Sequence, residues 1–128
     1  MPAAGYDWRM TTRADYHTDT ASEFLTKAHA YLAEGDLLQA SEKGWGAAAQ
    51  MVKAVAETQG WRHRTHADLY RTVNRLAAGQ TDDELPRVFR SANALHQNFY
   101  EGDMPPEMVA GGLRDAERFV ELLGSYLP

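Results

Sequence analysis

The chain has 128 residues, with 13 Lys and Arg against 18 Asp and Glu, and therefore a formal net charge of −5; 44% of the residues are hydrophobic and 24% are charged. This length and composition predict one soluble globular domain and exclude disordered and collagen-like chains. The lack of cysteine excludes disulfides, thiolate metal sites and cysteine nucleophiles. No apolar run approaches the roughly 18 residues of a membrane-spanning helix, and the first 20 residues lack the apolar core of a signal peptide. We therefore expect a cytoplasmic protein with no membrane partner.

Residues 1–12 show no apolar periodicity, so we expect a flexible N-terminal arm before a single helical-bundle domain over 13–128. The first helix of this domain is predicted to start between Arg13 and Ala21 and to run to Glu34. Its apolar residues have the spacing of one helical face; they are Phe24, Leu25, Ala28, Tyr31 and Leu32.

The second predicted helix runs from Leu37 to about Thr58, with Asp36 as its N-cap. Gly44 and Gly46 lie inside it, and each costs up to about 1 kcal/mol of helix propensity relative to Ala. Close packing usually offsets such a cost, so we expect a neighbouring helix to approach at these glycines. The predicted buried face consists of Leu38, Trp45, Ala48, Ala49, Val52 and Val55.

Three further helices are predicted from caps and apolar periodicity. One covers residues 66–78, with Thr65 as its cap. Residues 81–84 have the pattern of a capping box, but Pro86 follows too deep for an unbroken helix, so we expect a short turn and then a helix over 86–101. The last helix begins at Pro106 and runs to about Leu123.

No stretch alternates with a period of two residues over more than a few positions, so no strand is predicted. Five helices joined by short loops predict an all-α fold, an up-and-down bundle of four to five helices.

The sequence lacks the complete pattern of two kinds of metal site. A di-metal carboxylate bundle needs Glu-x-x-His on two helices, and this chain has no such pair. His63 and His66 lie three residues apart, but no third ligand has helical spacing to them, whereas metal sites use three or four protein ligands. We therefore expect a solvated loop with a capping or packing histidine, no metal site and no cofactor.

Residues 61–75 carry four arginines against one aspartate, on a chain that is acidic overall. Aromatic rings lie among them, and positive charge interleaved with rings suits a phosphate backbone and unstacked bases. The candidate nucleic-acid-binding residues are Trp61, Arg62, Arg64 and Arg71. The alternative is a solvated helix face whose arginines pair with the acidic residues 82–84.

The segment 90–101, RSANALHQNFYE, holds the candidate catalytic residues Arg90, Asn93, His96 and Tyr100. On a helix, Asn93 and His96 are neighbours at i and i+3, and His96 and Tyr100 at i and i+4. Arg90 is offset from His96 by about 120°, so a single helix does not bring their side-chain ends together. A second copy of the helix across a two-fold axis could do so.

This segment resembles the HEPN superfamily (higher eukaryotes and prokaryotes nucleotide-binding), whose motif is Arg, four to six residues, then His. Five residues separate Arg90 from His96. The segments GDLLQASEK at 35–43 and LHQNFYE at 95–101 are also similar, and the resemblance covers most of residues 20–124. It is nearest to prokaryotic stand-alone HEPN-like proteins. The chain departs from the nuclease pattern at Ser91, directly after the Arg, and at Asn98, where a tyrosine is common.

The resemblance implies a homodimer that cleaves RNA without a metal or cofactor, as a toxin or defence-type endoribonuclease. His96 would move protons near neutral pH, and Arg90 would hold the scissile phosphate through two hydrogen bonds. Asn93 would orient the phosphate, and Tyr100 would donate a hydrogen bond or stack on a base.

Two other hypotheses remain open on the same residues. One is a non-catalytic module that binds RNA, a nucleotide or an antitoxin-type protein partner. The other is a structural dimerisation bundle in which Arg90 and Glu101 cap and pair, while His96 and Tyr100 pack at the dimer seam.

Overall fold

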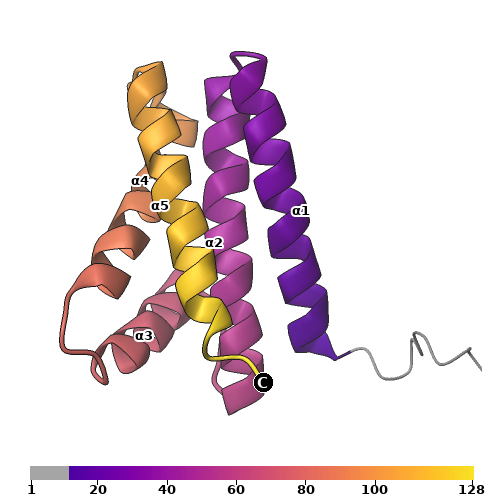
Figure 1. Cartoon of the computed structure of the whole chain (residues 1–128), viewed down its shortest axis with the longest axis vertical. Helices are drawn as coiled ribbons and strands as arrows, with labels where there is room; N and C mark the ends of the chain where they lie inside the picture. Colours follow the sequence, from indigo (N-terminus) through magenta and orange to yellow (C-terminus); the bar gives the residue numbers. More distant parts are fainter. Residues whose placement is uncertain (1–11) are drawn as a thin grey trace, which may run out of the picture.

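The computed structural model describes residues 12–128, and within this range the chain forms five α-helices and no strand (Figure 1). The helices are α1 (Arg13–Ala33), α2 (Leu37–Gln59), α3 (His66–Ala77), α4 (Glu84–Glu101) and α5 (Pro106–Gly124). The predicted all-α class is confirmed, and the bounds of four helices agree with the predicted ones to within one residue.

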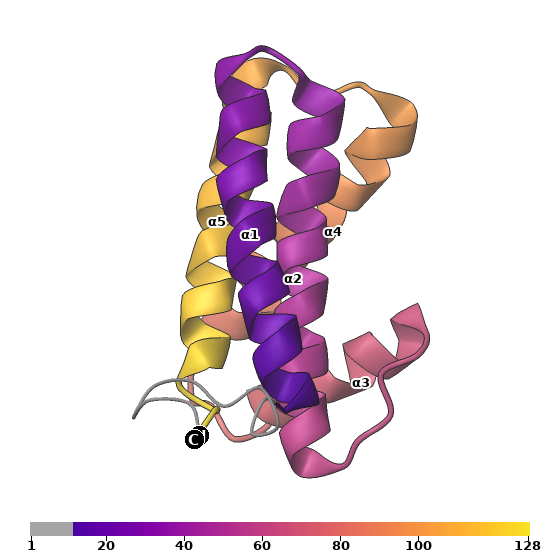
Figure 2. The same ribbon diagram turned by 90° about the vertical axis from the view of Figure 1, so that its right-hand side faces the viewer.

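Helix α2 lies at the centre of the bundle and packs against each of the other four helices. Helices α1, α2 and α5 run side by side along the long axis, and α4 completes the bundle beside α2 and α5 (Figures 1 and 2). The shorter α3 lies at one end and projects at an angle from the long helices (Figure 2). It contacts α2 and α4, and this placement creates the groove described below.

Side-chain caps fix where three of the helices begin. Asp36 accepts a hydrogen bond from the backbone N–H of Gln39 at 3.1 Å, and Thr65 forms a capping box with Asp68, so both predicted caps are confirmed. A second capping box joins Thr12 to Asp15 at the start of α1. Thr12, assigned from sequence to the arm, is therefore the N-cap of the bundle, and the rest of the expected arm lies outside the described residues.

The predicted start of α4 was wrong. The helix begins at Glu84, so Pro86 is its third residue, and the first intrahelical bond is donated by the backbone N–H of Arg87 to the carbonyl of Asp83 at 3.0 Å. A proline in the first turn removes no helical hydrogen bond, because the N–H groups there have no intrahelical partner. The expected capping box at 81–84 does not form; instead Asp82 accepts from the backbone N–H of Glu84.

Glycines let the helices approach closely at the core. A Cβ on Gly44 of α2 would lie 2.5 Å from Leu113 Cδ2 and 2.9 Å from Leu95 Cδ1, and a Cβ on Gly46 would lie 2.9 Å from Phe24 Cδ2. The expected close approach is thus confirmed for both glycines. The prediction that Leu38 belongs to the buried face of α2 was wrong. Leu38 is 42% exposed, because it lies near the end of the bundle beside the α4–α5 loop.

Within residues 12–128, no helix has both the length and the apolar character needed to cross a membrane.

Candidate functional site

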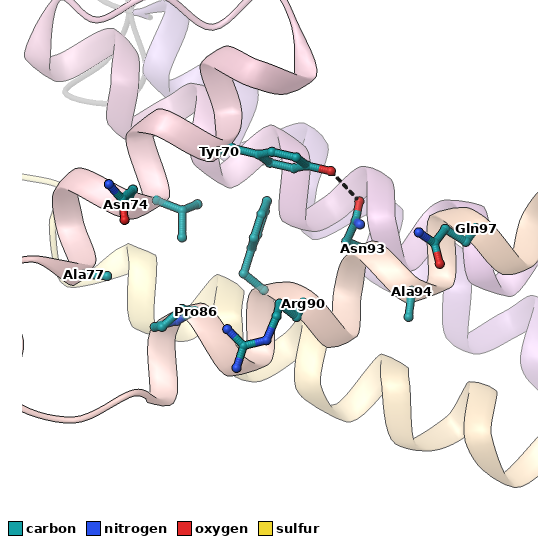
Figure 3. A pocket seen from close by; sticks show the side chains of 10 residues that line it. Tyr70, Asn74, Ala77, Pro86, Arg90, Asn93, Ala94 and Gln97 are labelled. Carbon is teal, nitrogen blue, oxygen red and sulfur yellow. Dashed lines mark hydrogen bonds between the residues drawn. The ribbon is translucent and has the colours of Figure 1, made fainter.

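A groove of about 500 Å³ lies between α3 and α4 (Figure 3). Its floor is apolar and its rim carries amide, phenol and guanidinium groups. The lining residues are Tyr70, Val73, Asn74, Ala77, Pro86, Phe89, Arg90, Asn93, Ala94 and Gln97. Two of the four candidate catalytic residues, Arg90 and Asn93, therefore lie at this groove.

Tyr70 and Asn93 join the two walls of the groove. The Tyr70 hydroxyl donates a hydrogen bond to Asn93 Oδ1 at 3.3 Å, from α3 across to α4 (Figure 3). Arg90 lies one turn before Asn93 and is exposed, and no carboxylate among the described residues pairs with its guanidinium. The expected pairing of Arg90 with Glu101 is not observed.

His96 lies on the adjoining side of α4 and does not line the groove. Its ring is 5.3 Å from that of Trp45, 5.2 Å from that of His66 and 5.4 Å from that of Tyr100, measured between centroids. We call Trp45, His66, His96 and Tyr100 the ring row. Within the ring row Trp45 is buried and His96 is half-buried, whereas His66 and Tyr100 are exposed.

A carboxylate approaches His96 from α2: Glu42 Oε1 lies 3.4 Å from His96 Nδ1. Both side chains are partly exposed. A carboxylate in this position can accept a hydrogen bond from Nδ1–H and leave Nε2 free to accept a proton, which is the arrangement that a general base requires. In one chain, however, Arg90 and His96 belong to different surfaces, as the helical offset predicted.

The four candidate nucleic-acid-binding residues divide between two surfaces. Trp61, Arg62 and Arg71 line a polar cleft on the side of α3 away from the groove. There, Arg71 pairs with Asp68 at 2.8 Å, and the guanidinium of Arg75 covers the ring of Trp61 at 4.8 Å. Stacking on Trp61 would require Arg75 to move.

Arg64 lies instead beside the ring row. It lines a cleft with Lys53, His63, His66 and Trp45. This places two basic side chains, Arg64 and Lys53, at the α3 end of the ring row.

Asp68 lies in the first turn of α3, and its carboxylate binds the backbone of the loop that precedes the helix. Burial works against its charge, but the backbone N–H groups of Arg64 and Thr65, the Thr65 hydroxyl and the charge of Arg71 together outweigh burial and lower the pKa of Asp68. Thr65 and Asp68 thus fix the position of Arg64 in the loop and of His66 at the start of α3.

The acidic residues 82–84 do not neutralise the arginines of α3. Glu84 forms two hydrogen bonds with Arg118 of α5, at 2.9 and 3.1 Å. These bonds are the main cause that lowers the pKa of Glu84, against the opposing effect of burial. The alternative hypothesis, in which the arginines of residues 61–75 pair with the acidic residues 82–84, is therefore wrong.

Sequence reasoning missed the residues of α2 that complete the surface around His96. Glu42 and Trp45 lie 54 and 51 positions before His96, and no local spacing reports such a contact. It also missed His17 and Glu57, which lie close to His63. Of these three residues, the sequence analysis had considered only His63 as a metal ligand.

Asn98, one of the two departures from the nuclease motif, is a core residue. It is 4% exposed, donates from Nδ2 to Ser41 Oγ at 3.0 Å and accepts at Oδ1 from the backbone N–H of Met104 at 2.9 Å. It therefore fastens α4 to α2 and to the α4–α5 loop, and it does not reach the groove.

Fold and site together define a small α-helical bundle in which the partly exposed ring row lies beside a helix–helix groove. The chain belongs to the archaeal PaREP1/PaREP8 family, whose model matches residues 16–120. A crystal structure of a protein from Sulfolobus solfataricus is similar over 93% of this chain and 99% of that one, with a TM-score of 0.69 and 23% identity. At this identity the likeness establishes the fold alone. Among curated proteins none matches the chain.

Proposed function

We propose that this protein binds single-stranded RNA on the outward face of α4, with bases stacking on the ring row and phosphates contacting Arg90 and Arg64. The observation that carries the proposal is the ring row itself. Successive ring centroids of Trp45, His66, His96 and Tyr100 lie 5.2–5.6 Å apart, and Tyr100 is 73% exposed at one end.

The two exposed rings of the row, His66 and Tyr100, can serve as stacking platforms for unpaired bases, and each stacked base contributes about 1–3 kcal/mol. Arg90 at the groove and Arg64 and Lys53 at the other side supply cations on both flanks of the row. The resemblance of residues 90–101 to the HEPN superfamily supports a nucleotide or RNA ligand, and a homodimer forms part of the proposal. In a dimer built on α4, two ring rows would lie near each other.

The test is fluorescence anisotropy with a labelled single-stranded RNA 20-mer at 50 and 200 mM salt. Tyr100→Ala and His66→Ala are each expected to weaken binding by about 5–150-fold, the equivalent of one lost stacking contact. Tyr16→Ala is the matched control, because Tyr16 is a 62% exposed tyrosine on α1, outside the ring row. Equal affinity of Tyr100→Ala and Tyr16→Ala would contradict the proposal.

Arg90→Ala tests the phosphate contact separately. Loss of one phosphate contact is expected to reduce the slope of log affinity against log salt by about 1. Arg114→Ala, which removes an exposed arginine of α5, should leave the slope unchanged. If Arg90→Ala and Arg114→Ala changed the salt slope equally, Arg90 would not contact a phosphate and the RNA would bind at another surface.

One observation favours a second candidate, metal-independent RNA cleavage: Glu42 faces His96 Nδ1. In that reaction His96 accepts the proton of a ribose 2′-OH, O2′ attacks phosphorus, and the bond from phosphorus to O5′ breaks. The leaving oxygen takes up a proton, and the product carries a 2′,3′-cyclic phosphate. Arg90 of a second copy would stabilise the charge on the phosphate.

Incubation of RNA with the protein in EDTA, followed by analysis of the chain ends, tests this candidate. Cleavage that leaves a cyclic phosphate should vanish in His96→Ala and fall in Glu42→Gln. His29→Ala, which removes an exposed histidine that also faces a carboxylate, is the control. RNA binding without cleavage by the wild-type protein would reject the second candidate and retain the first.

A further inference from the structure

Three donor side chains meet at the end of the bundle where α1 begins and α2 ends. His17 comes from α1, Glu57 from the last turns of α2, and His63 from the loop that follows. One ligand atom of each lies within 4.8 Å of the other two, and all three residues are partly buried. Among the described residues, this is the group of three that could hold a metal ion.

Gln50 sets the protonation of His17. Its Oε1 lies 2.6 Å from His17 Nδ1. An amide oxygen can only accept a hydrogen bond, so Nδ1 is the donor, and in the neutral ring Nε2 then carries the lone pair. Metal-bound histidines commonly donate their second ring N–H to an oxygen in this way, and that bond fixes the ring and its tautomer. Gln50 therefore supplies the supporting contact that a ligand histidine needs.

Glu57 supplies the negative charge. It forms a short hydrogen bond with His63 Nε2, and this bond is the main cause that lowers the pKa of Glu57, with burial opposing it. The His17 and His63 rings meet edge to face with centroids 5.5 Å apart, so both rings already border the carboxylate.

Two imidazoles and one carboxylate are a donor set that zinc uses in sites with an open fourth position. Zinc bonds of about 2.0–2.2 Å in a tetrahedron place donor atoms about 3.3 Å apart. The present spread of up to 4.8 Å needs a contraction of up to about 1.5 Å, and His63 Nε2 and the Glu57 carboxylate, which are now hydrogen-bonded, must move apart. Rotation of partly exposed side chains can provide both changes. We propose that His17, Glu57 and His63 bind a divalent metal ion of the zinc type, with Gln50 orienting His17.

Binding would replace the hydrogen bond between His63 and Glu57. The metal takes the His63 ring nitrogen that now donates to Glu57, and the neutral ring keeps its single proton on the other nitrogen. One positive charge, that of Arg13, acts on Glu57 from the start of α1 and opposes a cation. The donor set must outweigh this repulsion.

His29 and Glu117 provide an internal comparison. His29 Nε2 lies 2.7 Å from Glu117 Oε1 on the exposed surface. This is also a histidine–carboxylate pair, but no third His or carboxylate among the described residues joins it. If one histidine and one carboxylate were enough to bind the metal ion, His29 and Glu117 would bind it as tightly as the proposed site.

The experiment is calorimetric titration of the untagged full chain with Zn²⁺, together with visible absorption spectra after addition of Co²⁺. We expect one equivalent of Zn²⁺ to bind, and Co²⁺ to give the strong visible bands of a tetrahedral site. His17→Gln, Glu57→Gln and His63→Gln should each weaken binding at least about 10-fold, and Gln50→Ala should weaken it by about 10–100-fold. His29→Gln should bind as the wild-type chain does.

Several outcomes would overturn the proposal: no saturable equivalent of Zn²⁺, a loss in His29→Gln as large as in His63→Gln, or unchanged binding in His17→Gln. Should His63→Gln fail to fold, His17→Gln decides, because His17 is a partly exposed residue within a long helix. Zn²⁺ should also raise the melting temperature of the wild-type chain and not that of His17→Gln. None of these measurements involves RNA, so the metal site and the RNA surface can fail independently.

Discussion

Asn98 and Ser41 form a hydrogen bond inside the core, 3.0 Å long, between helices α4 and α2. Ser41 is fully buried, and Asn98 uses its other amide atom to accept from the backbone N–H of Met104. Every polar atom of this small network has a partner. The network therefore holds α4, with its site residues, in one rotation relative to α2.

Asn98→Ala should destabilise the protein by about 1–3 kcal/mol, because it leaves the Ser41 hydroxyl and the Met104 N–H buried without partners. Urea denaturation measures the change. Gln97→Ala, at the neighbouring exposed position, should stay within about 0.5 kcal/mol of the wild-type chain. A double-mutant cycle with Ser41→Ala should show coupling between the two positions; additive effects would contradict the network.

Adjacent glycines of α5 should respond in opposite directions to alanine. A Cβ on Gly112 would lie 2.6 Å from Leu95 Cδ2, and Leu95 is completely buried between Gly44 and Gly112. Gly112→Ala should therefore destabilise by about 1–3 kcal/mol through overpacking. A Cβ on Gly111 would meet only the end of the Arg114 side chain at 3.5 Å, so Gly111→Ala should stabilise by up to about 1 kcal/mol. Thermal unfolding of both variants tests the pair, and equal shifts would contradict this packing.

Most of the fold was predictable from sequence because its signals are local. Asp36 and Thr65 cap helices through bonds to residues three positions away, and such bonds can be recognised in a single segment. The start of α4 was misplaced because Pro86 was treated as an interior residue, whereas it occupies the first turn. Leu38 was misassigned because periodicity gives the direction of a side chain and not the point where the bundle ends.

The candidate site was predictable only along α4. The helical period predicted the separation of Arg90 from His96, and the structure places Arg90 at the groove and His96 outside it. The partners of these residues come from distant segments: Tyr70 is 23 positions from Asn93, and Glu42 is 54 from His96. The spacing argument about metal ligands considered only residues near His63 in sequence, so it did not reach His17 and Glu57.

Asp68 should make the stability of the bundle depend on pH. Its pKa is lowered in the folded chain, so its contribution is complete above the unfolded value of about 3.9 and is lost as pH falls through the folded value. The difference in unfolding free energy between wild type and Asp68→Asn should thus be constant from pH 7 to about 5 and shrink below about 4. Urea denaturation at several pH values measures it.

Asp103→Asn, an exposed carboxylate in the α4–α5 loop, is the control for charge loss alone and should change the free energy of unfolding at pH 7 by less than about 0.5 kcal/mol. A difference for Asp68→Asn that grows as the pH is lowered would contradict the assigned direction of the pKa shift.

The separation of Arg90 from His96 in one chain gives the cleavage candidate a sharp test. If each site takes Arg90 from one copy and His96 from the other, Arg90→Ala and His96→Ala should both be inactive alone. When the two variants are co-expressed, random pairing gives about half mixed dimers, and each mixed dimer keeps one intact site of two. About a quarter of wild-type cleavage should therefore return. Arg90→Ala co-expressed with a second copy of itself should recover none, and a mixed sample that stays inactive would rule out a site of this kind.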